Sequence, residues 1–270
     1  MAIKLIVLDL DGTLLKSKWK VHPDNIAMIK RVYQEKPDVK IVIATGRAPI
    51  STIPHAKACA MNEKTGHIIC YNGGSVIDII CNKQAVLFQK ALTTEQGTEI
   101  LNFAKENKIR IWGYATDNQT AYINRRSLKV LIVEHFNKLK VKKLKHNQVP
   151  TFYKVLLFCE NKKQVPVILE KLGQNKDLEL ATSSHSVIEV NPAGINKAIA
   201  VQFLAKKWNL QPEEIMACGD GMNDYKLLEW VKYGIVMDNA PDELKKISYG
   251  ITAKNTECGV AKAIEKYVLS

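Results

Sequence analysis

Short runs of branched apolar residues alternate along this chain with longer amphipathic segments. The first run, Ile3 to Leu8, ends directly at Asp9, and similar runs follow at Val39 to Ala44 and Ile215 to Cys218. Continuous apolar runs of this length are typical of parallel strands buried on both faces, and their alternation with helical segments is typical of an α/β fold. We therefore predict a Rossmann-like, doubly wound parallel sheet.

The character of the chain changes between about residues 83 and 188. Helical patterns such as Glu95 to Asn107 now mix with alternating strands such as Lys154 to Glu160. After Gly194 the alternation of strand and helix resumes. We predict a discontinuous core domain, residues 1–82 and 189–270, with an inserted α+β cap domain, residues 83–188.

Composition restricts the cellular setting. No apolar run approaches the roughly 20 residues that a membrane span needs, and the first run is too short and too acidic for a signal peptide. The six cysteines form no C-x-x-C pair, and Cys70, Cys159 and Cys218 lie within apolar runs. We expect a cytoplasmic protein without a membrane partner.

The net charge is +12, and the surplus is concentrated between Arg125 and His146, where eight Lys or Arg residues accompany one acid, Glu134. This stretch is interpreted as a solvated, basic helix face, or as a surface that attracts phosphorylated substrates or nucleic acid. No helix-turn-helix, zinc-finger or RNA-recognition signature accompanies the charge, so we do not expect a nucleic-acid partner.

Two acidic loops follow buried strands. Asp9-Leu10-Asp11-Gly12-Thr13 comes after the first, and Gly219-Asp220-Gly221-Met222-Asn223-Asp224 comes after a later one. Ligands of open parallel sheets bind beyond the carboxyl ends of the strands. There, one aspartate can attack phosphorus, a second can move a proton, and the remaining carboxylates suit Mg²⁺. The alternative is a pair of ordinary turns.

Two basic positions accompany these acids. Thr45-Gly46-Arg47 follows another buried strand and offers a hydroxyl, backbone N–H groups and a cation to a phosphate, although Thr-Gly is also common in turns. Lys197 lies at the start of a predicted helix, where the helix dipole disfavours a cation unless an anion is near. Alone, it would be interpreted as a surface lysine.

As a set, these motifs resemble the haloacid dehalogenase superfamily of hydrolases. The resemblance rests on D-L-D-G-T at 9–13, A-T-G-R at 44–47, Lys197 and G-D-G-M-N-D at 219–224. N-G-G at 72–74 and M-D-N-A-P-D-E-L-K at 237–245 resemble the Cof-type subfamily with a IIB-type cap. The family commonly has other residues at three positions of this chain, Asn196, Ala198 and Asp238. These differences bear on the shape of the pocket rim, and therefore on the substrate that is expected.

The resemblance implies roles for individual residues. Asp9 would be the nucleophile and Asp11 the general acid/base. The implied Mg²⁺ ligands are Asp9, Asp11 through its backbone carbonyl, Asp220 and Asp224. The implied phosphate and substrate contacts are Leu10 through its backbone N–H, Thr45, Gly46, Arg47, Asn72, Lys197 and Asn223.

We therefore predict a Mg²⁺-dependent phosphomonoesterase that forms an aspartyl-phosphate and acts on a small phosphorylated metabolite: a sugar phosphate, a nucleotide or a cofactor phosphate. The alternatives are a phosphosugar mutase of the phosphomannomutase type, and a basic protein that binds nucleic acid or an acidic partner. We expect a monomer or a weak homo-oligomer. Specificity is expected from cap side chains such as Trp112, Tyr114, Asp117 and His185.

Overall fold

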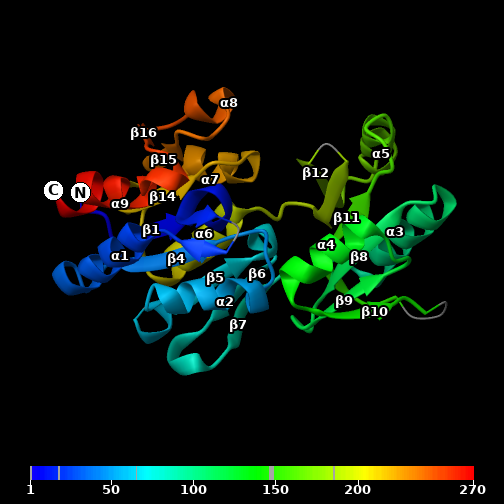
Figure 1. Cartoon of the computed structure of the whole chain (residues 1–270), viewed down its shortest axis with the longest axis horizontal. Helices are drawn as coiled ribbons and strands as arrows, with labels where there is room; N and C mark the ends of the chain where they lie inside the picture. The colour runs from blue at the N-terminus through cyan, green and yellow to red at the C-terminus, as the bar shows by residue number, and fades with distance from the viewer. Residues whose placement is uncertain (1, 18, 65, 146–148, 185) are drawn as a thin grey trace. The chain divides into compact units, whose positions relative to one another are not determined.

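The structure is a computed structural model that describes residues 2–17, 19–64, 66–145, 149–184 and 186–270. The chain divides into two compact units (Figure 1). The first comprises Met1–Gly46, Thr52–Phe88 and Asn196–Ser270, and the second comprises Arg47–Ser51 and Gln89–Ile195. Both ends of the chain therefore belong to the first unit.

An eight-stranded sheet runs through the first unit in the order β16-β15-β14-β1-β4-β5-β6-β7. Its strands are β1 (Leu5–Leu8), β4 (Lys40–Ala44), β5 (His67–Cys70), β6 (Ser75–Asp78), β7 (Ala85–Gln89), β14 (Ile215–Gly219), β15 (Tyr233–Met237) and β16 (Gly250–Thr252). From β16 to β5 all neighbours are parallel, and β6 pairs antiparallel with β5. Leu8 lies opposite both Cys218 of β14 and Ile43 of β4, so these three strands end level with one another.

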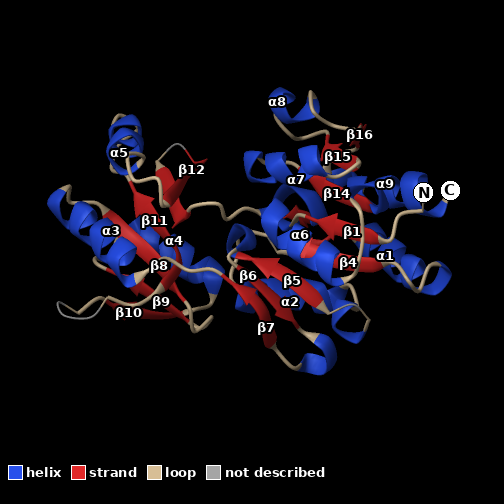
Figure 2. Cartoon of the chain, turned by 180° about the vertical axis from the view of Figure 1, so that it is seen from behind, coloured by secondary structure: helices blue, strands red, loops and turns tan. Residues whose placement is uncertain are grey.

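Helices flank this sheet. They are α1 (Pro23–Glu35), α2 (Pro49–Ala58), α6 (Lys197–Lys207), α7 (Tyr225–Trp230), α8 (Asp242–Lys245) and α9 (Gly259–Ile264), and a small hairpin is formed by β2 (Leu15–Ser17) and β3 (Lys20–Val21). Helix α1 begins at Pro23, whose fixed φ suits the first helical position. The view from behind shows α6 lying across the strands (Figure 2).

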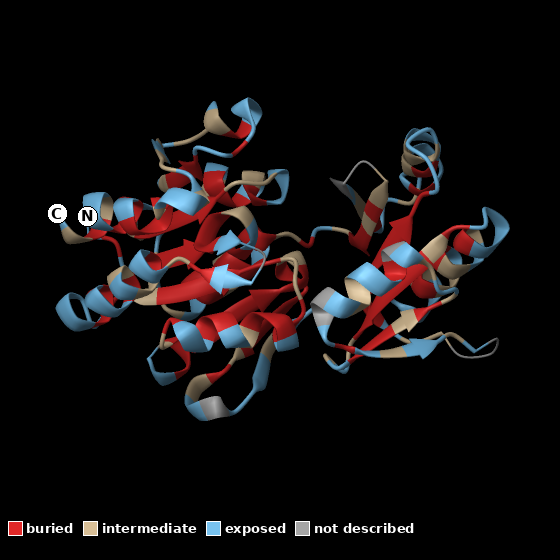
Figure 3. Ribbon diagram, viewed as in Figure 1, coloured by how far each residue is buried: buried red, intermediate tan, exposed pale blue. Residues whose placement is uncertain are grey.

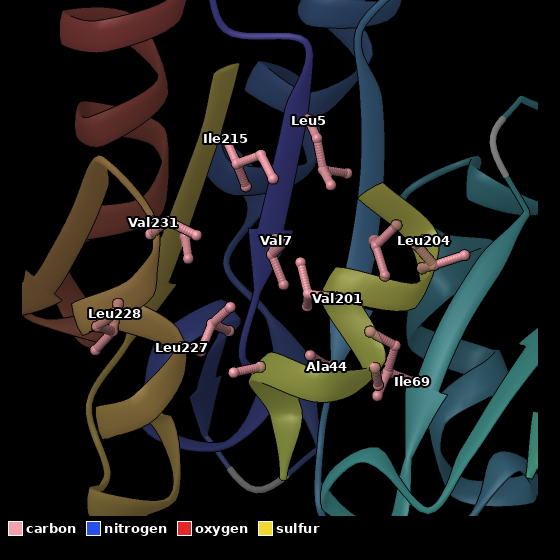
Figure 4. Packing of buried hydrophobic residues seen from close by; sticks show 14 of the residues in the cluster. Leu5, Val7, Ala44, Ile69, Val201, Leu204, Ile215, Leu227, Leu228 and Val231 are labelled. Carbon is pink, nitrogen blue, oxygen red and sulfur yellow. The ribbon is translucent and has the colours of Figure 1, made fainter. Parts of the chain in front are cut away.

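The core of the first unit lies between the sheet and the α6–α7 pair (Figure 4). Leu5 and Val7 of β1 point to one face, where Val201 and Leu204 of α6 pack against them. The four side chains are fully buried, and the sheet as a whole is buried along its central strands (Figure 3). Because side chains alternate along a strand, Ile6 and Leu8 face the opposite side.

The second unit contains a six-stranded sheet in the order β10-β9-β8-β11-β13-β12. Its strands are β8 (Arg110–Ala115), β9 (Thr120–Ile123), β10 (Lys140–Lys143), β11 (Phe152–Phe158), β12 (Leu178–Ser184) and β13 (Val187–Pro192), and its helices are α3 (Thr94–Glu106), α4 (Leu128–Asn137) and α5 (Gln164–Leu172). Apolar residues of α3 and α5, such as Ile100 and Ile168, pack with Ile111 and Val155 of the sheet into a separate core.

The predicted fold class, a parallel α/β sheet with an α+β insertion, is confirmed. One local expectation is wrong: the sequence predicts a helix over Pro49 to Ala60 that Pro54 would break or delay, yet α2 begins at Pro49 and runs through Pro54. Pro54 removes only the hydrogen bond to the carbonyl of Ile50, in the first turn of the helix, and Ile50 is exposed to water. Within the described residues, no helix is long and apolar enough to cross a membrane.

Candidate active site

The chain leaves β1 at Asp9 and enters a tight turn, η1 (Leu10–Leu14). The backbone N–H of Asp9 still donates to the carbonyl of Cys218 on β14 (2.9 Å), so the carboxylate is anchored where the two strands end. Gly12 has φ +78°, and a Cβ built there would lie 2.1 Å from Oδ2 of Asp220. The turn therefore requires glycine for its conformation and also for the space that Asp220 occupies.

Lys197, at the first position of α6, reaches two carboxylates. Its Nζ donates to Oδ1 of Asp9 (2.5 Å) and to Oδ1 of Asp224 (2.6 Å). The exposed fraction is 0% for Lys197, 6% for Asp9 and 1% for Asp224. The helix dipole disfavours a cation at the start of a helix, and the sequence therefore predicted an anion near Lys197. The carboxylates of Asp9 and Asp224 are these anions.

Asp220 and Asp224 are held by further hydrogen bonds. Oδ1 of Asp220 accepts from the hydroxyl of Thr13 (2.8 Å), and Oδ2 accepts from the amide of Asn239 (3.1 Å). Oδ2 of Asp224 accepts from the backbone N–H groups of Asp220 and Gly221, both at 3.2 Å. These bonds fix the carboxylates before any ligand arrives.

Carboxylate oxygens of Asp9, Asp220 and Asp224 lie within 4.8 Å of one another. Three carboxylates and the single ammonium of Lys197 leave a formal charge of −2 in a largely buried cluster. An uncompensated buried charge is expensive, and hard oxygen ligands suit Mg²⁺, so a divalent cation fits both the charge and the donors.

The pKa values reflect this crowding. Burial raises the pKa of Asp9 well above its ordinary value; the charges of Asp224 and Asp220 add to the effect, and Lys197 opposes it. Burial raises the pKa of Asp220 to about 6, with Asp224 acting in the same direction. For Lys197, burial lowers the pKa, but the charges of Asp224 and Asp9 outweigh it and the net shift is upward.

Polar groups at the ends of β4 and β5 complete this edge of the sheet. Thr45 is buried, and its backbone bonds to β5 through the carbonyl of Ile69 (2.9 Å). Asn72, in a left-handed conformation (φ 56°), accepts through Oδ1 from the Asn223 side chain (3.2 Å). A Cβ on Gly46 would lie 2.9 Å from the same Oδ1, so glycine gives Asn72 its space.

The remaining predicted residues differ in their surroundings. Asp11 is exposed in the η1 turn and contributes its charge to the field at Asp220. The side chain of Leu10 is fully buried, so only its backbone can serve a ligand. Arg47 belongs to the second compact unit.

Sequence reasoning gave no role to Thr13 or Asn239, which both bind Asp220. Thr13 closes the acidic motif after β1, and Asn239 follows β15, so each lies just beyond a strand. Asn239 also donates to the carbonyl of Gly12 (3.0 Å) and so links the two acidic loops. Their positions just after buried strands were the signal in the sequence that could have identified both residues as part of the site.

The cap side chains named from the sequence are not equivalent. Trp112 is fully buried and Tyr114 nearly so, whereas Asp117 accepts from the backbone N–H groups of Gln119 and Thr120 in its own turn. His185 lies outside the described residues. Trp112 packs edge-on against Tyr114, with ring centroids 6.0 Å apart, so both residues contribute to packing within the second unit.

The family model of the haloacid dehalogenase-like hydrolases matches residues 6–264. The 5-amino-6-(5-phospho-D-ribitylamino)uracil phosphatase YcsE of Bacillus subtilis is 30% identical over 99% of this chain and 96% of its own length. A solved haloacid dehalogenase-like hydrolase from Bacteroides thetaiotaomicron superposes with a TM-score of 0.86 at 28% identity, covering 98% of this chain and 99% of the other. The subclass IIB sugar phosphatase BT4131 shares the fold, with a TM-score of 0.82 at 19% identity and 98% coverage of both chains.

Proposed function

This chain belongs to the haloacid dehalogenase-like hydrolases, and we propose that it is a Mg²⁺-dependent phosphatase that hydrolyses a small phosphorylated metabolite through an aspartyl-phosphate on Asp9. The observation that carries the proposal is the buried cluster of Asp9, Asp220 and Asp224 around Lys197, with its formal charge of −2. The charge of this cluster and its oxygen donors fit one divalent cation next to the carboxylate of Asp9.

Asp9 is the proposed nucleophile. Lys197 holds Oδ1, while within the described residues Oδ2 accepts no hydrogen bond and can attack phosphorus. As the new O–P bond forms, the bond from phosphorus to the leaving oxygen breaks, and Asp11 gives that oxygen a proton. Asp11 then takes a proton from water, whose oxygen attacks phosphorus, so that inorganic phosphate leaves and the carboxylate of Asp9 is restored.

The cation would be held by Asp9, Asp220, Asp224 and the backbone carbonyl of Asp11. When bound, Mg²⁺ supplies positive charge that offsets the carboxylates and the phosphoryl oxygens. Thr13 and Asn239 keep Asp220 oriented, which is the role of outer groups around a metal ligand.

The phosphoryl group would be held by Thr45, by the backbone of Leu10 and Gly46, and by Asn223. Asn72 fixes the Asn223 side chain through the hydrogen bond between them. Positioning of this kind supplies much of the catalysis in phosphoryl transfer, because the protein has little covalent chemistry to perform. Arg47 is proposed to lie near the substrate.

The activity for which the Bacillus subtilis relative YcsE is named suggests the first substrate to test. We propose a substrate that carries its phosphate on a flexible polyol or sugar, and 5-amino-6-(5-phospho-D-ribitylamino)uracil heads the panel. Sugar phosphates, nucleotides and cofactor phosphates complete it.

The test measures phosphate release across this panel, with and without Mg²⁺. We expect activity only with the divalent ion, and Asp9→Asn should lose on the order of a thousandfold or more in kcat while the fold survives. Asp38→Asn, an equivalent change at an exposed acid, is the matched control. Retained activity in Asp9→Asn would overturn the mechanism, and conversion of a hexose phosphate to its isomer without phosphate release would indicate a mutase.

A further inference from the structure

A second group of potential metal ligands lies outside the acidic cluster. His22 precedes α1, Asp24 is in its first turn, and Cys258 precedes α9. One ring nitrogen of His22, one carboxylate oxygen of Asp24 and the sulfur of Cys258 lie within 4.8 Å of one another. Residues more than 200 positions apart in the chain are thus brought together by the packing of α1 on α9.

The two helix starts that carry these side chains are locked together by Asn25, which is fully buried. Its Oδ1 accepts from the backbone N–H of Ala261 in α9 (2.9 Å), and its Nδ2 donates to the carbonyl of Leu14 (3.2 Å). Nδ1 of His22 accepts from the N–H of Asp24 (3.2 Å), a hydrogen bond that a metal ion on this nitrogen would replace. The two helix starts that carry the three donors are therefore held in fixed positions.

The donor types differ from those of the acidic cluster. A thiolate, an imidazole and a carboxylate form a set that suits Zn²⁺, whereas Mg²⁺ prefers oxygen alone. Cys258 and His22 are partly exposed, so an ion and a water molecule can reach them. The buried cysteines Cys59, Cys70, Cys159 and Cys218 offer no such access.

We propose that His22, Asp24 and Cys258 form a second metal site, selective for Zn²⁺ or a similar thiol-binding divalent ion, with water as the fourth ligand. Binding converts the Cys258 thiol to a thiolate and releases its proton to solvent. The ion links the start of α1 to the start of α9. Because it binds the folded state and its ligands are far apart in the unfolded chain, it stabilises the first unit.

The experiment uses Co²⁺ as a spectroscopic substitute for Zn²⁺ in the full chain carrying Cys81→Ser, which removes an exposed thiol. Mg²⁺ is kept in excess to occupy the acidic cluster. We expect one equivalent of Co²⁺ to produce a thiolate-to-cobalt charge-transfer band that Zn²⁺ abolishes, and Zn²⁺ to raise the melting temperature.

Two variants test individual ligands, and a third serves as a control at the acidic cluster. Cys258→Ser should abolish the band and the thermal shift. His22→Asn, which keeps a helix-capping side chain, should weaken Zn²⁺ binding by at least about tenfold, the lower end of what loss of an outer metal partner costs. Asp220→Asn should leave the band unchanged, and phosphatase activity with Mg²⁺ should be unchanged in Cys258→Ser. Absence of the band in the Cys81→Ser parent, or a band that survives Cys258→Ser, overturns the proposal.

Discussion

Lys197 is the residue on which the charge balance of the site depends. Its ammonium is fully buried between Asp9 and Asp224, and it bonds to one oxygen of each. It therefore separates two like charges and restrains the proposed nucleophile at the same time. Removing one member of such a buried group leaves the other charges without compensation.

Lys197→Met should therefore destabilise the first unit by about 3–5 kcal/mol in the absence of metal, the range measured when one partner of a buried ion pair is lost. Mg²⁺ should restore part of this loss, because it supplies positive charge to the same carboxylates. Urea unfolding with and without Mg²⁺ measures both effects. Lys206→Met, at an exposed position of the same helix, controls for the substitution itself and should change stability little. Equal effects of the two variants would contradict this account.

The raised pKa of Asp220, about 6, predicts how metal binding depends on pH. Below that pH the folded protein holds a proton on Asp220, and Asp9, whose pKa is raised as well, can hold a second. Mg²⁺ must displace these protons, so its affinity should fall by at least about tenfold per pH unit as the pH drops below 6. Calorimetric titration with Mg²⁺ between pH 5 and pH 8 measures the profile. A flat profile would show that Asp220 is already ionised in the metal-free protein.

The sequence could suggest these residues but not the contacts between them. Each acid follows a buried apolar run, so its place at the edge of the sheet was predictable from the chain alone. Lys197, taken by itself, was indistinguishable from a surface lysine, because Asp9 is 188 positions away and no local pattern reports that contact. The same holds for Asn239, whose amide bonds to two loops that are distant in sequence.

Among the elements, the turn after β1 lies very close to the side chain of Asp220. Gly12 has a left-handed backbone conformation, and it also lies against the carboxylate of Asp220. Experiment can separate the need for this conformation from the need for this space. Gly194 has a similar φ of +70°, but no atom of the described residues lies within 4 Å of a Cβ built there. The two glycines therefore form a matched pair.

Gly12→Ala should reduce both activity and Mg²⁺ affinity, because the added methyl group displaces the Asp220 carboxylate. Gly194→Ala should cost only the backbone strain, on the order of 1 kcal/mol, and leave Mg²⁺ affinity unchanged. Thermal unfolding and Mg²⁺ titration of both variants separate strain from displacement. Similar Mg²⁺ affinities in the two variants would mean that Asp220 can move without loss.

Regular elements were predictable where a local pattern determines them. The helical patterns at Glu95 to Asn107 and Gln164 to Leu172 predicted α3 and α5 to within one residue, because the apolar spacing of a helix is a local signal. The basic stretch from 125 to 146 was harder, and only part of it is a helix. Helix α4 is followed by β10, an edge strand whose lysines are exposed and can discourage pairing with another chain.

For the whole molecule, the first unit depends on both ends of the chain. The C-terminal helix α9 contributes Val260 and Ile264, which are fully buried, and it packs on α1 near the N-terminus. The second unit has a core of its own. Loss of a buried side chain in α9 should therefore weaken the first unit selectively.

Ile264→Ala should destabilise the first unit by about 2–5 kcal/mol, because it removes buried methyl groups and leaves a cavity. Hydrogen exchange followed by mass spectrometry resolves the two units. Amides of β1 should exchange at least about tenfold faster, since 1.4 kcal/mol corresponds to tenfold. Amides of β11 should keep their rates.

Ile251→Ala, at an exposed position of the edge strand β16, is the control. It removes the same atoms and should change the exchange rates of neither β1 nor β11. An equal acceleration in β1 and β11 would show that the two units unfold together, and that the inserted unit depends on the closure of the chain ends.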